Sequence, residues 1–272
     1  MNAVFPLVLA VALVVVLAFF LFRARRRIGR LRAALNSASL ELQQVQKAFH
    51  RFAPRSVVEQ IIRQGVAVHG ERQEVSIVFV DIVGFTNLAE SMEAEQLVEV
   101  LNGYFESMSL AISQHRGYVS KFIGDGLMAL FGTPHSNRWH ALDAVWAALA
   151  MRAALKEYNE SLRRRDLAPL EIGIGIHCGQ VVAGVIGNQQ LMEFTVIGDA
   201  VNTAARIEAQ TRVHQVDILI SQAVRRHLDD KFRVRELPPI TVKGKREALT
   251  LFTVEGYADH EESGVGRGAL EA

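Results

Sequence analysis

The sequence predicts an α+β fold whose core runs in the order strand, helix, hairpin, helix, strand. A buried apolar strand opens the domain, two long stretches have helical periodicity, and two short apolar runs flank a Gly-Asp-Gly turn. This order is the β-α-β-β-α-β plan of a ferredoxin-like palm. The elements, in order, are a strand at 75–80, a helix at 92–115, a hairpin at 118–131, a helix at 139–165 and a strand at 171–177.

Later segments are expected to extend this core. They are a helix from Ala200, a strand near Ile218 and a C-terminal hairpin around Gly244. The folded domain would then cover residues 74–257, with a flexible tail at 258–272. A chain of 272 residues has room for one such domain plus a smaller element.

The N-terminus begins with an apolar run. Residues 3–22 are 20 uncharged, mostly aliphatic positions, which matches the roughly 20 residues that a helix needs to cross the bilayer core. A cleaved signal peptide is the alternative, but no positive charge precedes the run and arginines follow it. Six arginines between Arg23 and Arg32 favour the cytoplasmic side. We therefore expect a single transmembrane helix at 1–22 in the inner (cytoplasmic) membrane, with the catalytic domain in the cytoplasm.

Residues 23–73 are expected to contain the basic flank, a coiled coil and a linker helix. Pro54 ends the coil pattern, and a short helix at 56–64 follows. The pattern predicts a short parallel coiled coil and hence a homodimer; an amphipathic helix on the membrane or on the next domain is the alternative. Apolar residues recur at steps of three and four at Ile28, Leu31, Leu35, Ala38, Leu42, Val45, Phe49 and Phe52.

Composition limits the classes of partner and site. The formal net charge of +1 gives no overall basic balance for nucleic acid. The single cysteine, Cys178, excludes an internal disulfide framework and a site built from cysteines. The nine histidines show no metal-ligand spacing, and His135 and His140 are interpreted as surface or structural residues.

Two carboxylates are the first candidates for chemistry. Asp81 directly follows the apolar run at 75–80, and Asp125 lies at the tip of the predicted hairpin. In the palm topology the first strand and the hairpin are neighbours, so both side chains should reach one edge of the sheet. Two hard oxygen ligands suit Mg²⁺ or Mn²⁺ and a phosphorylated substrate. Either aspartate alone would be typical of an ordinary turn and would not indicate a site.

A helix beginning near Asp199 presents the next candidates. Asn202 and Arg206 are four residues apart and share one helical face, where they could hold a ribose oxygen and a phosphate. Lys243 and Lys245 are surface lysines unless a site lies beside them. The sequence has no G-x-x-x-x-G-K-[ST] motif, so a P-loop is not supported.

Four ordered blocks over about residues 74–256 resemble the class III nucleotidyl cyclases. They are VDIVGFT, KFIGDGLMALFG, GIGIHCGQVVAGVIG and FTVIGDAVNTAARIE. The resemblance implies that Asp81, Asp125 and the carbonyl of Ile82 bind two Mg²⁺ or Mn²⁺ ions per active site. It also implies that amides near Phe85 and Thr86, with Lys243, meet the phosphates of the substrate.

The resemblance assigns the remaining roles as well. Asn202 would orient the ribose and Arg206 would stabilise charge on the α-phosphate. Lys121 matches the lysine that recognises adenine, and Thr195 occupies the partner position, as in a subgroup of adenylate cyclases. The Lys/Thr pair predicts ATP as the substrate, and cyclic AMP and pyrophosphate as the products.

In this family, metal residues of one subunit face base-binding and transition-state residues of the other, so a homodimer is implied. Three alternatives stay open. The chain could be a guanylate cyclase, a catalytically silent domain that senses nucleotides, or an inert membrane-tethered dimerisation module.

Overall fold

The structure is a computed structural model that describes residues 22–23, 25–32, 35–37, 39–40, 70–188, 192–239 and 249–258. The chain divides into two units, Met1–Val58 and Glu59–Ala272. The predicted membrane helix lies outside the described residues apart from Phe22, as do Lys243, Lys245 and most of the tail. Among the helices that the structure describes, none is both long and apolar enough to cross a bilayer.

The described residues between 22 and 40 are helical, which agrees with the helical periodicity of this stretch. Ile28, Leu31 and Leu35 are exposed. These are positions of the predicted coiled-coil seam, and the pairing of this helix with a second copy stays a prediction. The rest of the predicted coil, from 41 on, lies outside the described residues.

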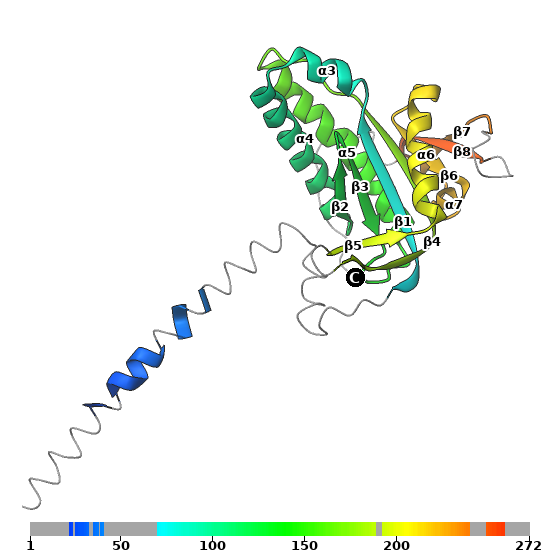
Figure 1. The fold of residues 1–272 in the computed structure, drawn as a ribbon. Coiled ribbons are helices and arrows are strands. Elements are labelled where there is room, and N and C mark those ends of the chain that lie inside the picture. The colour runs from blue at the N-terminus through cyan, green and yellow to red at the C-terminus, as the bar shows by residue number, and fades with distance from the viewer. Residues whose placement is uncertain are drawn as a thin grey trace, which may run out of the picture. The chain divides into compact units, whose positions relative to one another are not determined.

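The second unit is built on an eight-stranded sheet with the order β2-β3-β1-β4-β6-β8-β7, and β5 pairs with β4 (Figure 1). The predicted β-α-β-β-α-β core is confirmed by β1, α4, β2, β3, α5 and β4. The elements are β1 (Glu71–Ile82), α3 (Phe85–Ser91), α4 (Ala94–Gln114), β2 (Tyr118–Ile123), β3 (Gly126–Phe131), α5 (His140–Arg163), β4 (Ile172–Gly187), β5 (Met192–Ile197), α6 (Asp199–His214), β6 (Ile218–Ser221), α7 (Gln222–Arg225), β7 (Phe232–Glu236) and β8 (Leu251–Tyr257).

Three elements differ from the sequence prediction. A separate short helix, α3, follows β1 before the long helix α4 begins at Ala94. Strand β4 continues to Gly187 instead of ending near 177, and the hairpin it forms with β5 was not predicted. The C-terminal hairpin is confirmed by the antiparallel pairing of β7 with β8, although Gly244 lies outside the described residues.

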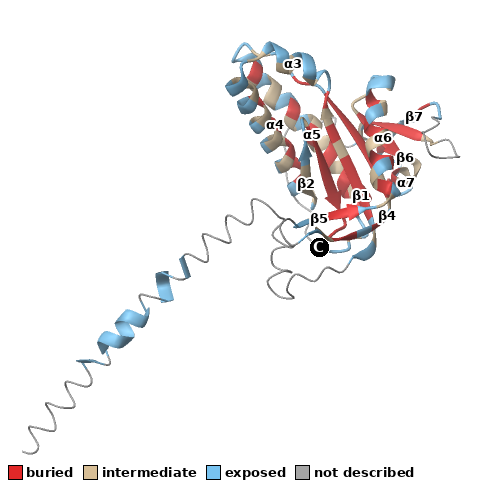
Figure 2. Ribbon diagram, viewed as in Figure 1, coloured by how far each residue is buried: buried red, intermediate tan, exposed pale blue. Residues whose placement is uncertain are grey.

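Strand β1 lies inside the sheet, between β3 and β4, and is largely buried, as Figure 2 shows. Side chains of a strand alternate between the two faces. Val78, Val80 and Ile82 pack with α4 and α5, whereas Val75 and Ile77 pack on the opposite side with residues of β5 and α6. Asp81 has the parity of the second face, which places it on the side of α6.

Helix α6 lies directly against β4 because β4 has glycines where the two elements touch. A Cβ atom added to Gly175 would lie 2.2 Å from the backbone nitrogen of Glu208 and 2.5 Å from its Cα. A side chain there would push the helix away from the sheet. Gly175 therefore sets the distance at which α6 presents its side chains next to β1.

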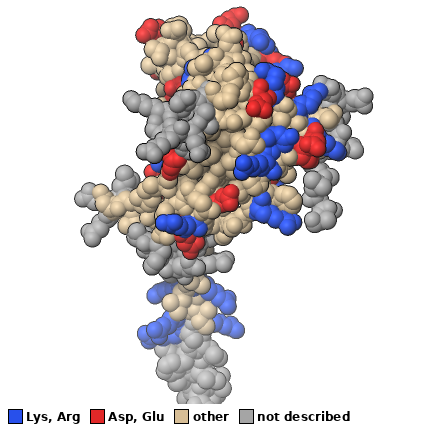
Figure 3. All heavy atoms as spheres, turned by 90° about the vertical axis from the view of Figure 1, so that its right-hand side faces the viewer, with Lys and Arg blue, Asp and Glu red and all other residues tan. Residues whose placement is uncertain are grey.

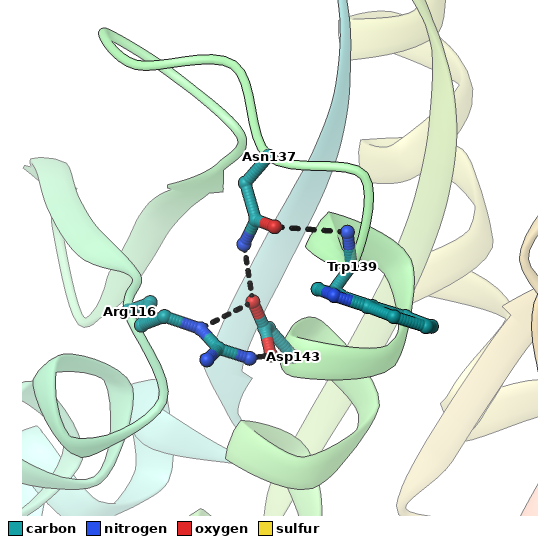
Figure 4. Close-up of polar contacts among 4 residues, drawn as sticks. All are labelled: Arg116, Asn137, Trp139 and Asp143. Atoms are coloured by element: carbon teal, nitrogen blue, oxygen red, sulfur yellow. Dashed lines mark hydrogen bonds and ion pairs between the residues drawn. The ribbon is translucent and has the colours of Figure 1, made fainter. Parts of the chain in front are cut away.

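The start of α5 is tied to the turn between α4 and β2 by the polar cluster of Figure 4. The carboxylate of Asp143, buried in α5, accepts hydrogen bonds from Nε of Arg116 at 3.0 Å and from Nδ2 of Asn137 at 2.7 Å, and Nη2 of Arg116 pairs with its other oxygen. Oδ1 of Asn137 in turn accepts the amide of Trp139. This cluster fixes where α5 begins.

Candidate active site

The structure brings Asp81 and Asp125 to the same edge of the sheet. Asp81 is next to last in β1, and Asp125 lies in the two-residue turn between β2 and β3. Because β1 pairs with β3, the turn rests against the end of β1. A Cβ atom at Gly126 would lie 2.9 Å from Oδ1 of Asp81 and 2.8 Å from the carbonyl oxygen of Val80, so only glycine leaves room for this approach.

The two carboxyl groups are electrostatically coupled. Partial burial raises the pKa of Asp125; the charge of Asp81 and a hydrogen bond between the two carboxyl groups raise it further, whereas a backbone hydrogen bond and the charge of Arg212 lower it. Two carboxylates that disfavour each other's ionisation attract a cation. The local arrangement therefore fits a divalent ion with a preference for oxygen ligands, such as Mg²⁺ or Mn²⁺.

Ile82 ends β1, and its side chain is buried in the core between the sheet and the helices. Only its main chain is therefore available to a ligand, as the predicted carbonyl contact requires. Phe85 and Thr86 are the first two residues of α3. The first amides of a helix have no partner inside it, so the hydrogen bonding of α3 leaves these two amides as donors.

Three residues that sequence reasoning missed surround the carboxylates. Arg212 of α6 pairs with Asp81 and, through Nη1 at 3.1 Å, with Oε1 of Glu208. Glu208 is only 8 % exposed. Burial raises its pKa to about 7; Arg212 opposes this rise, and Asp81 and Asp125 add to it.

Tyr104 of α4 lies beneath the same cluster and is fully buried. Burial, then the charges of Asp81, Asp125 and Glu208, raise the pKa of its hydroxyl. The hydroxyl has no hydrogen-bond partner among the described residues. A tyrosine in α4 gives no sequence signal for this place. Glu208 and Arg212 are on the same helix as Asn202 and Arg206 but on a different side of it, so the pattern of Asn202 and Arg206 does not lead to them.

Asn202 and Arg206 both lie on α6, as predicted, with Asn202 exposed and Arg206 half-buried. Within the described part of one chain, no hydrogen bond or ion pair joins either residue to Asp81 or Asp125. The structure thus presents two groups of candidate residues that do not meet in one chain. One group is the carboxylate pair, and the other is the face of α6 near its N-terminal end.

An ion pair links the strand of Lys121 to the strand of Thr195. Nζ of Lys121 in β2 pairs with Oε1 of Glu193 in β5 at 2.9 Å. Thr195, which is buried, follows Glu193 by two residues in the same strand, and side chains two apart lie on the same face. Glu193 was not predicted, although its spacing from Thr195 on a strand would have indicated it.

A cleft of about 980 Å³ lies beside this site but does not contain it. Its lining includes Val83 and Arg212 and neither Asp81 nor Asp125. Four of its charged residues form two pairs: Arg152 with Asp217, and Arg235 with Glu255. On the face that Figure 3 shows, acidic and basic side chains are interspersed. We place the candidate site at the carboxylates because the oxygen ligands are there.

The comparisons with known proteins agree with this geometry. A family profile described as "Adenylate and Guanylate cyclase catalytic domain" matches residues 67–256. An adenylate cyclase of Anabaena cylindrica is 34% identical over 239 residues, which cover 84% of this chain and 47% of that protein. The chain spans less than half the length of the curated relatives it matches first.

Two solved structures share the fold. The crystal structure of the guanylyl cyclase Cya2 has a TM-score of 0.66 and 34% sequence identity, covering 71% of this chain and 97% of that one. The adenylyl cyclase CyaB from P. aeruginosa has a TM-score of 0.64 and 33% identity, covering 68% and 95%. The chain therefore belongs to the class III adenylate and guanylate cyclase catalytic domain family.

Proposed function

We propose that the chain is an adenylate cyclase that converts ATP to 3′,5′-cyclic AMP and pyrophosphate. The observation that carries the proposal is the pair Asp81 and Asp125, held at one sheet edge in a chain of this family. When bound there with the Ile82 carbonyl, two Mg²⁺ or Mn²⁺ ions would lower the pKa of the ribose 3′-hydroxyl and neutralise charge on the leaving pyrophosphate.

The residues of the chain would position the substrate for an in-line displacement. The 3′-oxygen forms a bond to the α-phosphorus while the bond from that phosphorus to the β-phosphate bridging oxygen breaks, and the 3′ proton leaves to solvent. Asn202 orients the ribose, and Arg206 donates to the α-phosphate as its charge develops. Amides of Phe85 and Thr86 hold the phosphates, with Lys243 at their distal end.

Lys121 and Thr195 support ATP as the substrate. An ammonium group only donates hydrogen bonds, and adenine N1 is an acceptor, whereas guanine N1 carries a proton. The Thr195 hydroxyl can accept from the adenine amino group. Glu193 would hold Lys121 in place by the ion pair. GTP is the second candidate because Cya2, which this chain resembles, is a guanylyl cyclase.

We further propose that the active enzyme is a homodimer anchored in the inner membrane by residues 1–22. The separation of Asn202 and Arg206 from Asp81 and Asp125 within one chain supports sites completed by a second copy. The heptad pattern after the basic cluster supports a parallel pair, and the apolar run supports the anchor.

The test is cyclic nucleotide production by the purified 272-residue chain with ATP or GTP and Mg²⁺ or Mn²⁺. We expect metal-dependent cyclic AMP that is lost in Asp81→Asn and kept in the control Asp230→Asn, an exposed aspartate far along the chain. Lys121→Glu should lower the ratio of ATP to GTP turnover. Cyclic GMP as the main product would instead make the chain a guanylate cyclase. No product from either nucleotide in a sample that is a dimer would indicate a silent, nucleotide-sensing domain.

A further inference from the structure

A second cluster of metal-ligating side chains lies at the opposite end of β1 from Asp81. Glu74 of β1, Cys178 of β4 and His227, just after α7, each offer one ligand atom, and these atoms all lie within 4.8 Å of one another. Cys178 pairs with Ser76 in the β1–β4 ladder, so it lies diagonally across from Glu74 on the same face of the sheet. Three distant segments thus converge on one point.

The three side chains are available to a ligand. Within the described part of the chain, the side chains of Glu74 and His227 form no ion pair or hydrogen bond. The ring of His227 lies near the ring of His140, at a centroid distance of 5.7 Å. Glu74 and His227 are exposed and can adjust their rotamers, whereas Cys178 is only 4 % exposed. The cluster is therefore a buried thiol under two movable ligands.

We propose that Glu74, Cys178 and His227 form a site for a borderline-soft divalent ion of the Zn²⁺ class. Bonds of about 2.0–2.3 Å to a tetrahedral ion place its ligand atoms about 3.3–3.8 Å apart, so the three atoms need to close by at most roughly 1.0–1.5 Å. Thiolate and imidazole favour Zn²⁺ over Mg²⁺, which prefers oxygen ligands. Three protein ligands leave the fourth position to water.

Two buried residues, His140 and Ser76, lie next to the proposed site. Nδ1 of His140 lies 2.8 Å from Oγ of Ser76, and both residues are buried. The His140 ring lies beside the ring of His227, so this hydrogen-bonded pair forms the buried side of the site.

The site is separate from the carboxylate pair. Glu74 and Asp81 are seven residues apart on one strand, which is about 23 Å. The proposal therefore does not depend on the proposed function. The ion would join β1, β4 and the segment after α7, and so stabilise the folded domain against unfolding by mass action.

The test uses Co²⁺ as a spectroscopic probe on the purified 272-residue chain in excess Mg²⁺. One equivalent of Co²⁺ should produce a thiolate-to-cobalt charge-transfer band in the near ultraviolet, and Zn²⁺ should displace it and raise the Tm. Cys178→Ser should abolish the band. Glu74→Gln and His227→Gln should each weaken Co²⁺ binding at least about tenfold, because each removes a direct ligand.

The matched controls are Glu71→Gln, on the same strand, and His135→Gln, an exposed histidine of the loop before α5; both should bind Co²⁺ as the parent chain does. Glu74 and His227 are exposed, so their variants should keep the parent far-ultraviolet circular dichroism even if Cys178→Ser unfolds. A band that survives Cys178→Ser, or Co²⁺ binding unchanged in both Glu74→Gln and His227→Gln, would overturn the proposal.

Discussion

Arg212 competes with a cation for Asp81, because its guanidinium pairs with that carboxylate. Both side chains are about one-third exposed, and ion pairs at such sites contribute about 0.2–1 kcal/mol. We predict that Arg212→Gln tightens Mn²⁺ binding at Asp81 and Asp125 by about 1.4- to fivefold, which is that energy expressed as an affinity ratio. Titration followed by electron paramagnetic resonance measures it.

The control for this change is Arg226→Gln, an exposed arginine after α7. It removes the same charge without touching the carboxylates and should leave Mn²⁺ affinity unchanged. If Arg212→Gln weakens Mn²⁺ binding instead, the guanidinium organises Asp81 for the metal and does not compete with it.

Glu208 should make the free energy of unfolding depend on pH. Burial raises its pKa from 4.5 to about 7, so between these values the folded chain holds a proton that the unfolded chain has lost. The stabilisation from this group is complete below pH 4.5 and is lost as the pH rises through 7. We predict that Glu208→Gln removes this loss in metal-free buffer.

The measured quantity is the free energy of unfolding of the variant minus that of the parent chain. It should rise between pH 4.5 and 7 by on the order of 1–3 kcal/mol. Urea denaturation at several pH values gives both curves. Parallel curves over this range would mean that the Glu208 carboxyl ionises normally in the folded domain.

At the residue scale, the sequence located Asp81 and Asp125 because each follows a local signal, the end of an apolar strand and a Gly-Asp-Gly turn. Arg212 lies 131 positions from Asp81, so no local pattern connects the two. The cluster of Glu74, Cys178 and His227 was not predicted for the same reason, because its residues are far apart in the sequence. The chain has one cysteine, and its histidines show no metal-ligand spacing, so neither residue type indicated a site. The three ligands meet only because β1 pairs with β4 and the segment after α7 folds back beside them.

At the scale of elements, the packing of α6 on β4 positions half of the candidate site. Gly175→Ala would place a Cβ 2.2 Å from a backbone atom of α6, and a backbone cannot rotate away as a side chain can. We predict a loss of at least about 3 kcal/mol in the free energy of unfolding, the upper end for overpacking. Thermal or urea denaturation measures it.

Gly256→Ala in β8 is the matched change. The nearest atom to the added Cβ is Nη2 of Arg233, the far end of a flexible side chain, at 3.0 Å. We expect less than about 1 kcal/mol of change there. Equal losses at both glycines would show that strand preference, and not the α6 contact, decides the cost.

The polar cluster of Figure 4 makes a second prediction at this scale. Asp143→Ala removes the acceptor of Arg116 and Asn137 and leaves the buried start of α5 without its tie to the α4–β2 turn. Arg116 is 66% exposed and can return to water, so the expected loss is about 2 kcal/mol, within the range for a hydrogen bond to a charged group. Chemical denaturation measures it.

Asp230→Ala serves as the control because that carboxylate is fully exposed and lies 3.7 Å from its nearest cation, Arg225. It should not change stability measurably. A similar loss in both variants would mean that general charge balance, and not the cluster, stabilises α5.

The order of the core elements was predictable because each has a clear period, three to four residues in the helices and a short apolar run in the strands. The extent of β4 was not. Residues 178–187 include small and polar positions, and they continue the strand because they pair with residues 71–76 of β1 and with β5. Helix α3 has only seven residues, too few for a periodic pattern.

At the scale of the whole molecule, the proposed homodimer predicts complementation between inactive variants. Asp81→Asn would disable the metal half of a site, and Asn202→Ala combined with Arg206→Ala would disable the transition-state half. Each variant alone forms dimers without a complete site. Mixed dimers contain one intact site, in which the carboxylates of one copy meet the α6 face of the other.

If the variants are unfolded, mixed and refolded in equal amounts, about half of the dimers are mixed and each carries one of two sites, so about one quarter of the parent activity should return. The measurement is cyclic AMP formation by the mixture against each variant alone. A mixture of Asp81→Asn with Asp125→Asn controls for refolding, since both changes affect the same half and no site is restored. The mixture of Asp81→Asn with the double variant could instead stay at the activity of this control. Each copy would then complete its own site, and α6 would have to move to bring the two groups of one chain together.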